Sequence, residues 1–207
     1  MKLVVMRHGQ TDYNVENRYT GTTDIPINGT GRAQAIAAGT APSVSLVYAS
    51  PLKRAQETAH LCFPHAVLRT EPGLREMNFG DFQGANAKEL ADDPYFQQWH
   101  DSKWALPAPH GESRGQHQQM VLETVRTIVD REERKASHAA IIVAHGGVIM
   151  AICDGLLRPQ EKGTRDYLSW NPGNCALICA EVHHGTSGEL FLSDLSIHHH
   201  VGFIEQL

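Results

Sequence analysis

Residues 3–9 read Leu-Val-Val-Met-Arg-His-Gly, a short apolar run that ends in a cation, an imidazole and a glycine. Residues 140–147 repeat this pattern as Ala-Ile-Ile-Val-Ala-His-Gly-Gly. A short apolar run bounded by glycine is typical of a strand that is buried on both faces of a parallel sheet. Ligands of such sheets bind beyond the carboxyl ends of the strands. The sequence therefore predicts that both histidines lie at the binding edge of one sheet.

Strands and helices are predicted to alternate along most of the chain. Ser50 is a suitable N-cap and Pro51 suits a first helical turn, so a helix is predicted over residues 52–62. Apolar residues recur at helical spacing over residues 113–135. The predicted strands span 2–6, 46–49, 67–70 and 139–144, with further strands in 175–204 around a turn at 185–188; the other predicted helices span 31–39 and 147–157, and residues 8–28 are predicted to be a polar loop. This alternation predicts an α/β fold, a three-layer α/β/α arrangement with a mostly parallel central sheet.

Residues from about 77 to 112 interrupt the alternation. They contain short segments of helical character at 87–91 and 95–99, and a proline-rich stretch at 106–109. We interpret this region as a lid-like insertion that covers a site, within a single domain of residues 1–207. Trp99 and Trp104 are expected to pack inside the lid rather than to form a stacking platform.

Composition and charge exclude several classes of function. The net charge is −5 and no dense basic tract occurs, which argues against nucleic acid or an anionic membrane as a partner. No apolar segment approaches the roughly 20 residues that cross a bilayer. The four cysteines show no Cys-x-x-Cys pairing and no metal-like spacing with histidine, and the run at 198–200 is expected to be strand rather than a metal site. We therefore expect a cytoplasmic protein with reduced structural thiols and no bound metal.

The polar residues at the strand ends suit phosphoryl chemistry. Arg7 and Arg54 carry planar forks that can bind phosphoryl oxygens in pairs. A neutral His8 can attack phosphorus, and a protonated His145 can donate to an equatorial oxygen. Glu76 is the candidate acid that protonates the leaving alkoxide.

Glycines complete both motifs. Gly9, Gly146 and Gly147 carry no side chain, so the backbone can approach a bound anion there. A helix that begins at Gly147 would direct its first amides at negative charge. The sequence therefore predicts an anion site at this helix end.

Four blocks of sequence together resemble the histidine phosphatase superfamily, also called the phosphoglycerate-mutase-like family. They lie in family order and span nearly the whole chain. They read Arg-His-Gly-Gln-Thr at 7–11, Ser-Pro-Leu-Lys-Arg-Ala-Gln-Glu-Thr-Ala at 50–59, Leu-Arg-Glu-Met-Asn-Phe-Gly at 74–80 and Ala-His-Gly-Gly-Val at 144–148. Gln10 stands where the family more often has Glu.

The resemblance implies a role for each matching residue. It makes His8 the phosphorylated nucleophile and Glu76 the proton donor. It places Arg7, Arg54 and His145 around the phosphate, and it adds to phosphate or substrate binding the residues Asn14, Arg18, Thr20, Gly21 and Gly146. From the residues alone, Asn14 could instead cap a turn and Arg18 could instead form a surface ion pair.

The resemblance leaves the reaction open between hydrolysis and mutase-type transfer. Mutases of the family carry an arginine directly after the acid, where this chain has Met77, and this favours a phosphatase. The stretch at 17–21 is mutase-like. Residues 76–82 and 109–112 resemble the α-ribazole phosphatase branch, which acts in cobalamin biosynthesis, although broad-specificity sugar-phosphate phosphatases share much of this pattern. A non-catalytic phosphate-binding module is the third hypothesis.

The predicted partner is a small phosphorylated metabolite. No cofactor is predicted, because two arginines and an imidazolium can neutralise the charge that Mg²⁺ handles in other phosphoryl-transfer sites. The sequence does not report the oligomeric state, and a homodimer stays open.

Overall fold

Strand β1 (Lys2–Arg7) lies in the middle of the sheet and carries the first histidine motif at its carboxyl end. The computed structural model describes residues 1–163 and 165–207. In these residues the strand order is β3-β2-β4-β1-β5-β6. Strands β2 (Leu46–Ala49), β3 (Val67–Thr70) and β4 (Ala139–Ala144) run parallel to β1, and β4 pairs directly with it. On its other side β1 pairs antiparallel with β5 (Leu177–His184), which in turn pairs antiparallel with β6 (Leu190–His198). The predicted mostly parallel sheet is confirmed.

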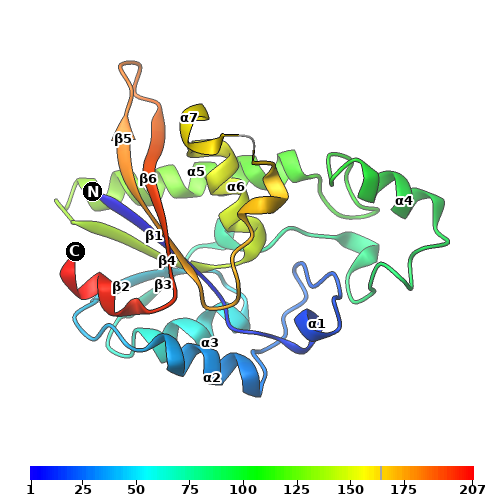
Figure 1. The fold of residues 1–207 in the computed structure, drawn as a ribbon, viewed down its shortest axis with the longest axis horizontal. Helices are drawn as coiled ribbons and strands as arrows, with labels where there is room; N and C mark the ends of the chain where they lie inside the picture. The colour runs from blue at the N-terminus through cyan, green and yellow to red at the C-terminus, as the bar shows by residue number, and fades with distance from the viewer. Residues whose placement is uncertain (164) are drawn as a thin grey trace.

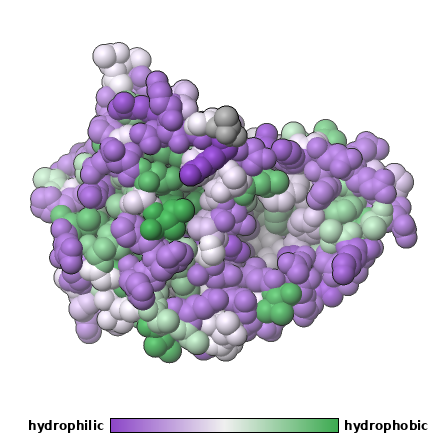
Figure 2. Space-filling model, viewed as in Figure 1, coloured by the Kyte–Doolittle hydropathy of each residue, from purple (hydrophilic) through white to green (hydrophobic). Residues whose placement is uncertain are grey.

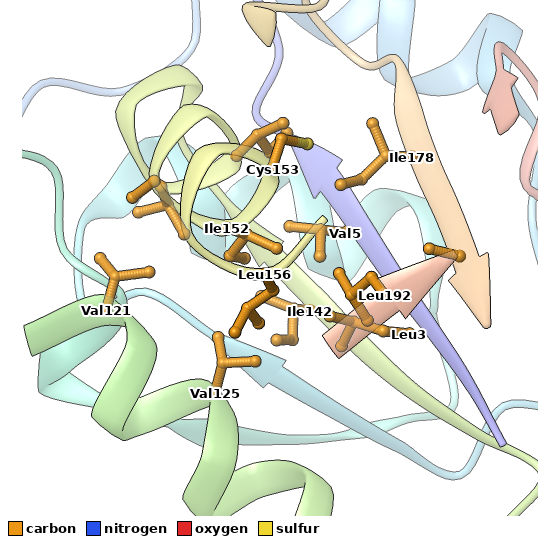
Figure 3. Packing of buried hydrophobic residues seen from close by; sticks show 14 of the residues in the cluster. Leu3, Val5, Val121, Val125, Ile142, Ile152, Cys153, Leu156, Ile178 and Leu192 are labelled. Atoms are coloured by element: carbon orange, nitrogen blue, oxygen red, sulfur yellow. The ribbon is translucent and has the colours of Figure 1, made fainter. Parts of the chain in front are cut away.

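Helices cover both faces of the sheet, so the predicted three-layer arrangement is also confirmed (Figure 1). One face packs against α2 (Gly29–Ala38) and α3 (Lys53–Cys62), and the other against α5 (Arg114–Glu133) and α6 (Gly146–Leu156). Side chains of β1 alternate between the two layers: Val4 and Met6 join the α2–α3 side, and Leu3 and Val5 join the α5–α6 side. Figure 3 shows the second of these cores, with Val121 and Val125 of α5 facing Ile142 and Leu156.

Side-chain caps set several helix starts. Ser113 and Gln116 form a capping box at the start of α5, and Asn28 accepts from the amide of Gly31 at the start of α2. In the insertion, α4 (Pro94–Asp101) begins after an Asp93 side chain that accepts from two amides. These caps explain why the predicted starts of the helices near residues 31 and 113 lie close to the observed ones.

Three predicted segments differ from the structure. The polar loop at 8–28 contains a short helix, α1 (Asp12–Val15), capped by Thr11. Residues 87–91 form turns rather than a helix, because the Asn86 side chain accepts from the amides of residues 88 and 89 and so competes with helical bonding. Residues 201–206 form the 3₁₀ helix η4 (Val201–Gln206) rather than a strand, since β5 begins opposite His198 and offers no further partner.

The remaining elements are short. The 3₁₀ helices η1 (Pro72–Leu74) and η2 (Gly80–Phe82) flank the predicted acid, and α7 (Pro159–Lys162) and η3 (Tyr167–Trp170) join α6 to β5. None of the helices in the described part of the chain is long and apolar enough to cross a membrane.

The insertion has a small aromatic core of its own. Trp99 is fully buried there, so it packs within the insertion. Trp104 is only partly buried and contacts both this cluster and the main core. The cluster comprises Met77, Phe79, Phe82, Phe96, Trp99 and Ala108, with Tyr19, Leu90 and Trp104 packed against it. In Figure 1 the insertion extends to the right of the sheet, beyond the carboxyl end of β1.

The four cysteines are buried and free. Burial raises the pKa of Cys62, Cys153 and Cys175 to about 12 in each case, so little thiolate forms at neutral pH. This agrees with the predicted structural thiols.

Candidate active site

The pairing of β1 with β4 brings the two histidine motifs together. The parallel register places Arg7 opposite Ala144, so the next residue of each strand, His8 and His145, also lie side by side. Their ring centroids are 5.2 Å apart in an edge-on arrangement. Both side chains are buried. Two residues 137 positions apart in the numbering thus share one site because their strands are adjacent.

His8 is held in a single tautomer. Its Nδ1–H donates to the carbonyl oxygen of Gly9 over 2.7 Å, which leaves the lone pair on Nε2. Burial lowers the pKa of His8 well below its usual value, and the charges of Arg54 and Arg7 lower it further. The imidazole is therefore neutral at physiological pH, as predicted for a nucleophile.

Arg7 is fixed by the loop that precedes β5. Its Nη1–H groups donate to the side-chain oxygen of Asn171 and to the carbonyl oxygen of Pro172. Its buried Nε has no partner among the residues that the structure describes. A buried, unpaired N–H is costly, and a bound anion would satisfy it.

Arg54 enters the site from the first turn of α3 and is fully buried. Its Nη groups donate to the carbonyl oxygens of Thr23 and Gly21, over 2.8 and 2.7 Å, and its Nε–H donates to Nδ1 of His145 over 3.2 Å. Burial lowers the pKa of Arg54 to about 10, so the group remains a cation at neutral pH.

His145 differs from the protonated form expected from the sequence. Its Nδ1 accepts from Arg54, so the ring proton lies on Nε2, which donates to the hydroxyl of Ser50 over 2.7 Å. Burial lowers the pKa of His145 well below its usual value, and the charge of Arg54 acts in the same direction. The ring is therefore neutral, because an arginine already occupies the position that a proton would take.

Ser50 is consequently not the N-cap of α3. The cap position belongs to Leu52, which makes no side-chain cap bond, and the Ser50 hydroxyl instead contacts His145 and accepts weakly from the Leu52 amide. Local sequence predicted a cap, but tertiary structure uses the hydroxyl in the site.

Glu76 lies in the loop after η1, and both of its oxygens accept backbone amides. Oε1 accepts from Met77, and Oε2 accepts from Gly147 at the start of α6 over 3.0 Å. A Cβ atom at Gly147 would lie 2.0 Å from Oε1, so only glycine permits this approach. The Gly147 amide, predicted to face an anion, donates here to a carboxylate of the protein itself.

The remaining predicted binding residues divide into two groups. Asn14, Thr20, Gly21 and Gly146 all line the cavity that holds the histidines. Arg18 also reaches the cavity lining, but its guanidinium donates to the carboxylates of Glu16 and Glu89 and to a carbonyl oxygen. The alternative in which Arg18 forms an ion pair therefore agrees with the structure. Asn14 completes the capping box with Thr11 at the start of α1 and also lines the cavity.

Sequence reasoning missed several residues of the site. Asn171 holds Arg7, and the Asn174 side chain donates to the carbonyl oxygen of His8 and to Asn14. His117 is fully buried on α5, and its Nε2–H donates to the carbonyl oxygen of Arg75, directly before Glu76. Their local sequence contains no signal for these contacts, which depend on the way distant loops meet.

The cavity extends well beyond the histidines. Its volume is about 390 Å³, and its lining includes Tyr19, Met77, Phe79 and Trp104, which belong to or pack against the aromatic core of the insertion. Tyr167 also lines it, and its hydroxyl donates to the carbonyl oxygen of Gly147. Figure 2 shows the surface hollowed between the insertion, on the right, and the rest of the molecule. The lining therefore combines the cationic groups near the histidines with the aromatic side chains of Tyr19, Phe79 and Trp104, which we call the aromatic end of the cavity.

The family is established by comparison with known proteins. A family model described as "Histidine phosphatase superfamily (branch 1)" matches residues 3–194. The chain therefore belongs to the histidine phosphatase superfamily, whose members are phosphatases and mutases, and it is an enzyme of this type.

Relatives of both types are similar to the chain. A 2,3-bisphosphoglycerate-dependent phosphoglycerate mutase 2 of Gloeobacter violaceus is 34% identical, covering 77% of this chain and 78% of the mutase. A glucosyl-3-phosphoglycerate phosphatase of Mycobacterium tuberculosis is 36% identical, covering 76% and 75%. The solved structure of a mycobacterial glucosyl-3-phosphoglycerate phosphatase aligns with a TM-score of 0.74 at 30% identity, covering 93% of this chain and 96% of that one.

Proposed function

We propose that the protein is a phosphomonoesterase that transfers the phosphoryl group of a small ester to His8 and then to water. The observation that carries this proposal is the buried, neutral imidazole of His8 beside the cations Arg7 and Arg54. With Nδ1–H donated to Gly9, the lone pair of Nε2 is available to attack phosphorus. Two guanidinium groups then balance the charge of the phosphate.

The reaction has two steps. In the first, a bond forms between Nε2 of His8 and phosphorus, the ester P–O bond breaks, and Glu76 gives its proton to the departing alkoxide. In the second, a water oxygen attacks phosphorus, the N–P bond breaks, and the water proton passes to the Glu76 carboxylate. Inorganic phosphate leaves, and both side chains return to their initial states.

The same cavity end supplies the groups that bind the phosphoryl oxygens. The unpartnered Nε of Arg7 supports a direct contact with the anion. Arg54 is held by His145, and the Nε2–H of His145 donates to Ser50 in the structure. We assign supporting contacts with phosphate or substrate to Asn14, Thr20, Gly21 and Gly146, which line the cavity. Residues 1–207 act as one catalytic domain in this proposal, with the insertion as its lid.

In the part of the chain that the structure describes, the lack of an unpaired arginine at the aromatic end favours hydrolysis over mutase-type transfer. A phosphoglycerate carries a carboxylate, which needs a cation beside the acid residue. Met77 follows Glu76 directly, and Arg18 is already paired with Glu16 and Glu89. Among the described residues that line the cavity, the other arginines are Arg7 and Arg54, at the phosphate end.

The physiological ester is a finer proposal. α-Ribazole 5′-phosphate, predicted from the sequence, remains one candidate, and a broad range of sugar phosphates is the alternative. The glucosyl-3-phosphoglycerate phosphatases suggest a third ester by similarity, but its glycerate carboxylate meets the same lack, within the described ranges, of an unpaired cation beside Glu76.

A phosphoryl-trapping experiment tests the reaction. Rapid mixing with a ³²P-labelled ester and alkaline quenching should yield an acid-labile phosphoenzyme. The label should pass to water, giving inorganic phosphate, faster than it passes to added 3-phosphoglycerate. The variant H8A should lose the label and about 10⁴-fold or more of kcat, whereas H60A, which removes an exposed histidine of α3, should retain both. EDTA should not alter the rate, because arginines supply the positive charge.

Two results would contradict the proposal. Faster transfer of the label to 3-phosphoglycerate than to water would establish a mutase. Turnover by H8A at the wild-type rate would remove His8 from the chemistry.

A further inference from the structure

We infer that the aromatic end of the cavity is a subsite for a ring on the uncharged alcohol part of the substrate, and that Trp104 is its specificity-determining wall. This inference rests on the proposed phosphatase function, because the phosphate of the ester would bind beside His8 and the alcohol part would occupy the rest of the cavity. It concerns the class of ester that the enzyme selects.

The shape and chemistry of this end suit a ring. Tyr19, Phe79 and Trp104 meet edge to face, with ring centroids 5.4 Å apart for Tyr19–Phe79 and 5.7 Å apart for Phe79–Trp104. Aromatic surfaces of this kind bind flat apolar rings and the C–H faces of sugars. The cavity of about 390 Å³ leaves room for such a group beside the phosphate.

The backbone around Trp104 is held in an unusual conformation. Lys103 and Trp104 are consecutive non-glycine residues in the left-handed region, with φ of 51° and 66°. Such a conformation persists only where the surrounding contacts hold it, and strained backbone conformations of this kind cluster at functional sites. The turn is therefore built to direct one particular side chain.

Contacts from three directions fix this turn. The amide of Arg114, at the start of α5, donates to the carbonyl oxygen of Trp104 over 2.7 Å, and the indole stacks on the buried Trp99 at 5.9 Å. The ammonium group of Lys103 pairs with Asp166 over 3.0 Å, which ties the insertion to the segment before η3. The wall is thus positioned before any ester binds, which reduces the entropic cost of binding.

Trp104 also lines a second, neighbouring cavity. This cavity has a volume of about 250 Å³ and is otherwise lined by His100, Asp101, Lys103 and Leu168. Because the indole lies on both linings, it limits the length of the alcohol that the catalytic cavity can accept.

Esters that differ only in the ring provide the test. 2-Phenylethyl phosphate and n-propyl phosphate are both esters of primary alkyl alcohols, so their leaving groups have similar basicity. Glucose 6-phosphate supplies a sugar ring in place of an aromatic one. We expect at least one of the two ring-bearing esters to exceed n-propyl phosphate in kcat/KM by about tenfold or more, with the difference mainly in KM; the better of the two identifies the ring type.

Variants separate a subsite from a structural role. W104L keeps an apolar side chain without the ring and should reduce the ring-to-propyl ratio by about fivefold or more. Y95A removes an exposed aromatic residue of α4 that does not line the cavity, and it should leave the ratio unchanged. Damage to the lid fold alone would lower all three rates together and would appear as a lower midpoint of thermal unfolding.

The outcomes distinguish this inference from the proposed function. If no ester is hydrolysed and rapid mixing with a labelled ester gives no phosphoenzyme, the phosphatase function itself fails. If all three esters are hydrolysed and both ring-bearing esters stay below tenfold preference, or if W104L keeps the wild-type ratio, the phosphatase function stands and the ring subsite is overturned.

Discussion

Burial has opposite consequences for the two kinds of cation in this site. It leaves Arg54 charged, because a pKa lowered to about 10 is still far above neutral pH. It makes His8 and His145 neutral, because their usual pKa lies close to neutrality and burial lowers it well below that value. One environment therefore provides permanent cations for an anion and an unprotonated nucleophile beside them.

The neutral histidines predict a pH-dependent stability. In the unfolded chain both have a pKa of about 6.5, and in the folded protein both lie well below it, so the unfolded state binds more protons as the pH falls through 6.5. The contribution of these two histidines to the free energy of unfolding should therefore be constant above pH 6.5. It should decrease towards pH 5, by up to about 1.4 kcal/mol per pH unit for each imidazole. Urea unfolding at pH 7.5, 6.5 and 5.5 in phosphate-free buffer measures this slope.

A variant isolates the contribution of each residue. H8Q should have a shallower slope than the wild type over this range, since one of the two titrating groups is gone. An identical slope in the two proteins would show that His8 is not neutralised by folding. The other histidines are present in both proteins, so their contribution cancels in the comparison.

At the scale of elements, local signals succeeded where a helix or strand is selected by its own residues. The box formed by Ser113 and Gln116 starts α5, and the apolar run of 139–144 matches β4 from end to end. They failed where a side chain or a missing partner decided the outcome. Asn86 holds residues 87–91 in turns, and η4 forms because β5 ends its pairing at His198.

The end of α5 offers a second prediction. Ala136, which is exposed, follows this helix with a φ of 57°, where an L side chain is strained and glycine is not. A136G should therefore raise the free energy of unfolding by about 1 kcal/mol. Chemical denaturation of the two proteins measures the difference.

A matched substitution reverses the sign. A37G removes an exposed alanine inside α2, where helical backbone favours alanine, and it should lower the free energy of unfolding by about 0.5–1 kcal/mol. Equal effects of the two substitutions would mean that the conformation at residue 136 carries no strain.

At the scale of the whole molecule, the site depends on segments from across the chain. β1 supplies Arg7, α3 supplies Arg54, the loop after η1 supplies Glu76, and the loop before β5 fixes Arg7 through Asn171. An anion bound at this point would contact elements from both halves of the sheet, so we expect its binding to be coupled to global folding.

Orthovanadate, a tetrahedral analogue of phosphate, tests this coupling. At a hundred times its Kd it should stabilise the folded protein by about 2.7 kcal/mol, seen as a higher midpoint of thermal unfolding. R54Q should lose most of the shift, whereas R126Q, which changes an exposed residue of α5, should keep it. No shift in the wild type at millimolar vanadate would mean that the cluster does not bind a tetrahedral oxyanion.

The sequence by itself determined the layers, the strands of the sheet and the positions of His8 and His145 at strand ends, because apolar runs and helical spacing are local properties. Only the tertiary structure decided the state of these residues. The proton of His145 is displaced by Arg54, Ser50 serves the site instead of a helix, and Arg18 is paired with two carboxylates. Protonation and pairing depend on burial and on neighbours remote in the chain, which no local pattern encodes.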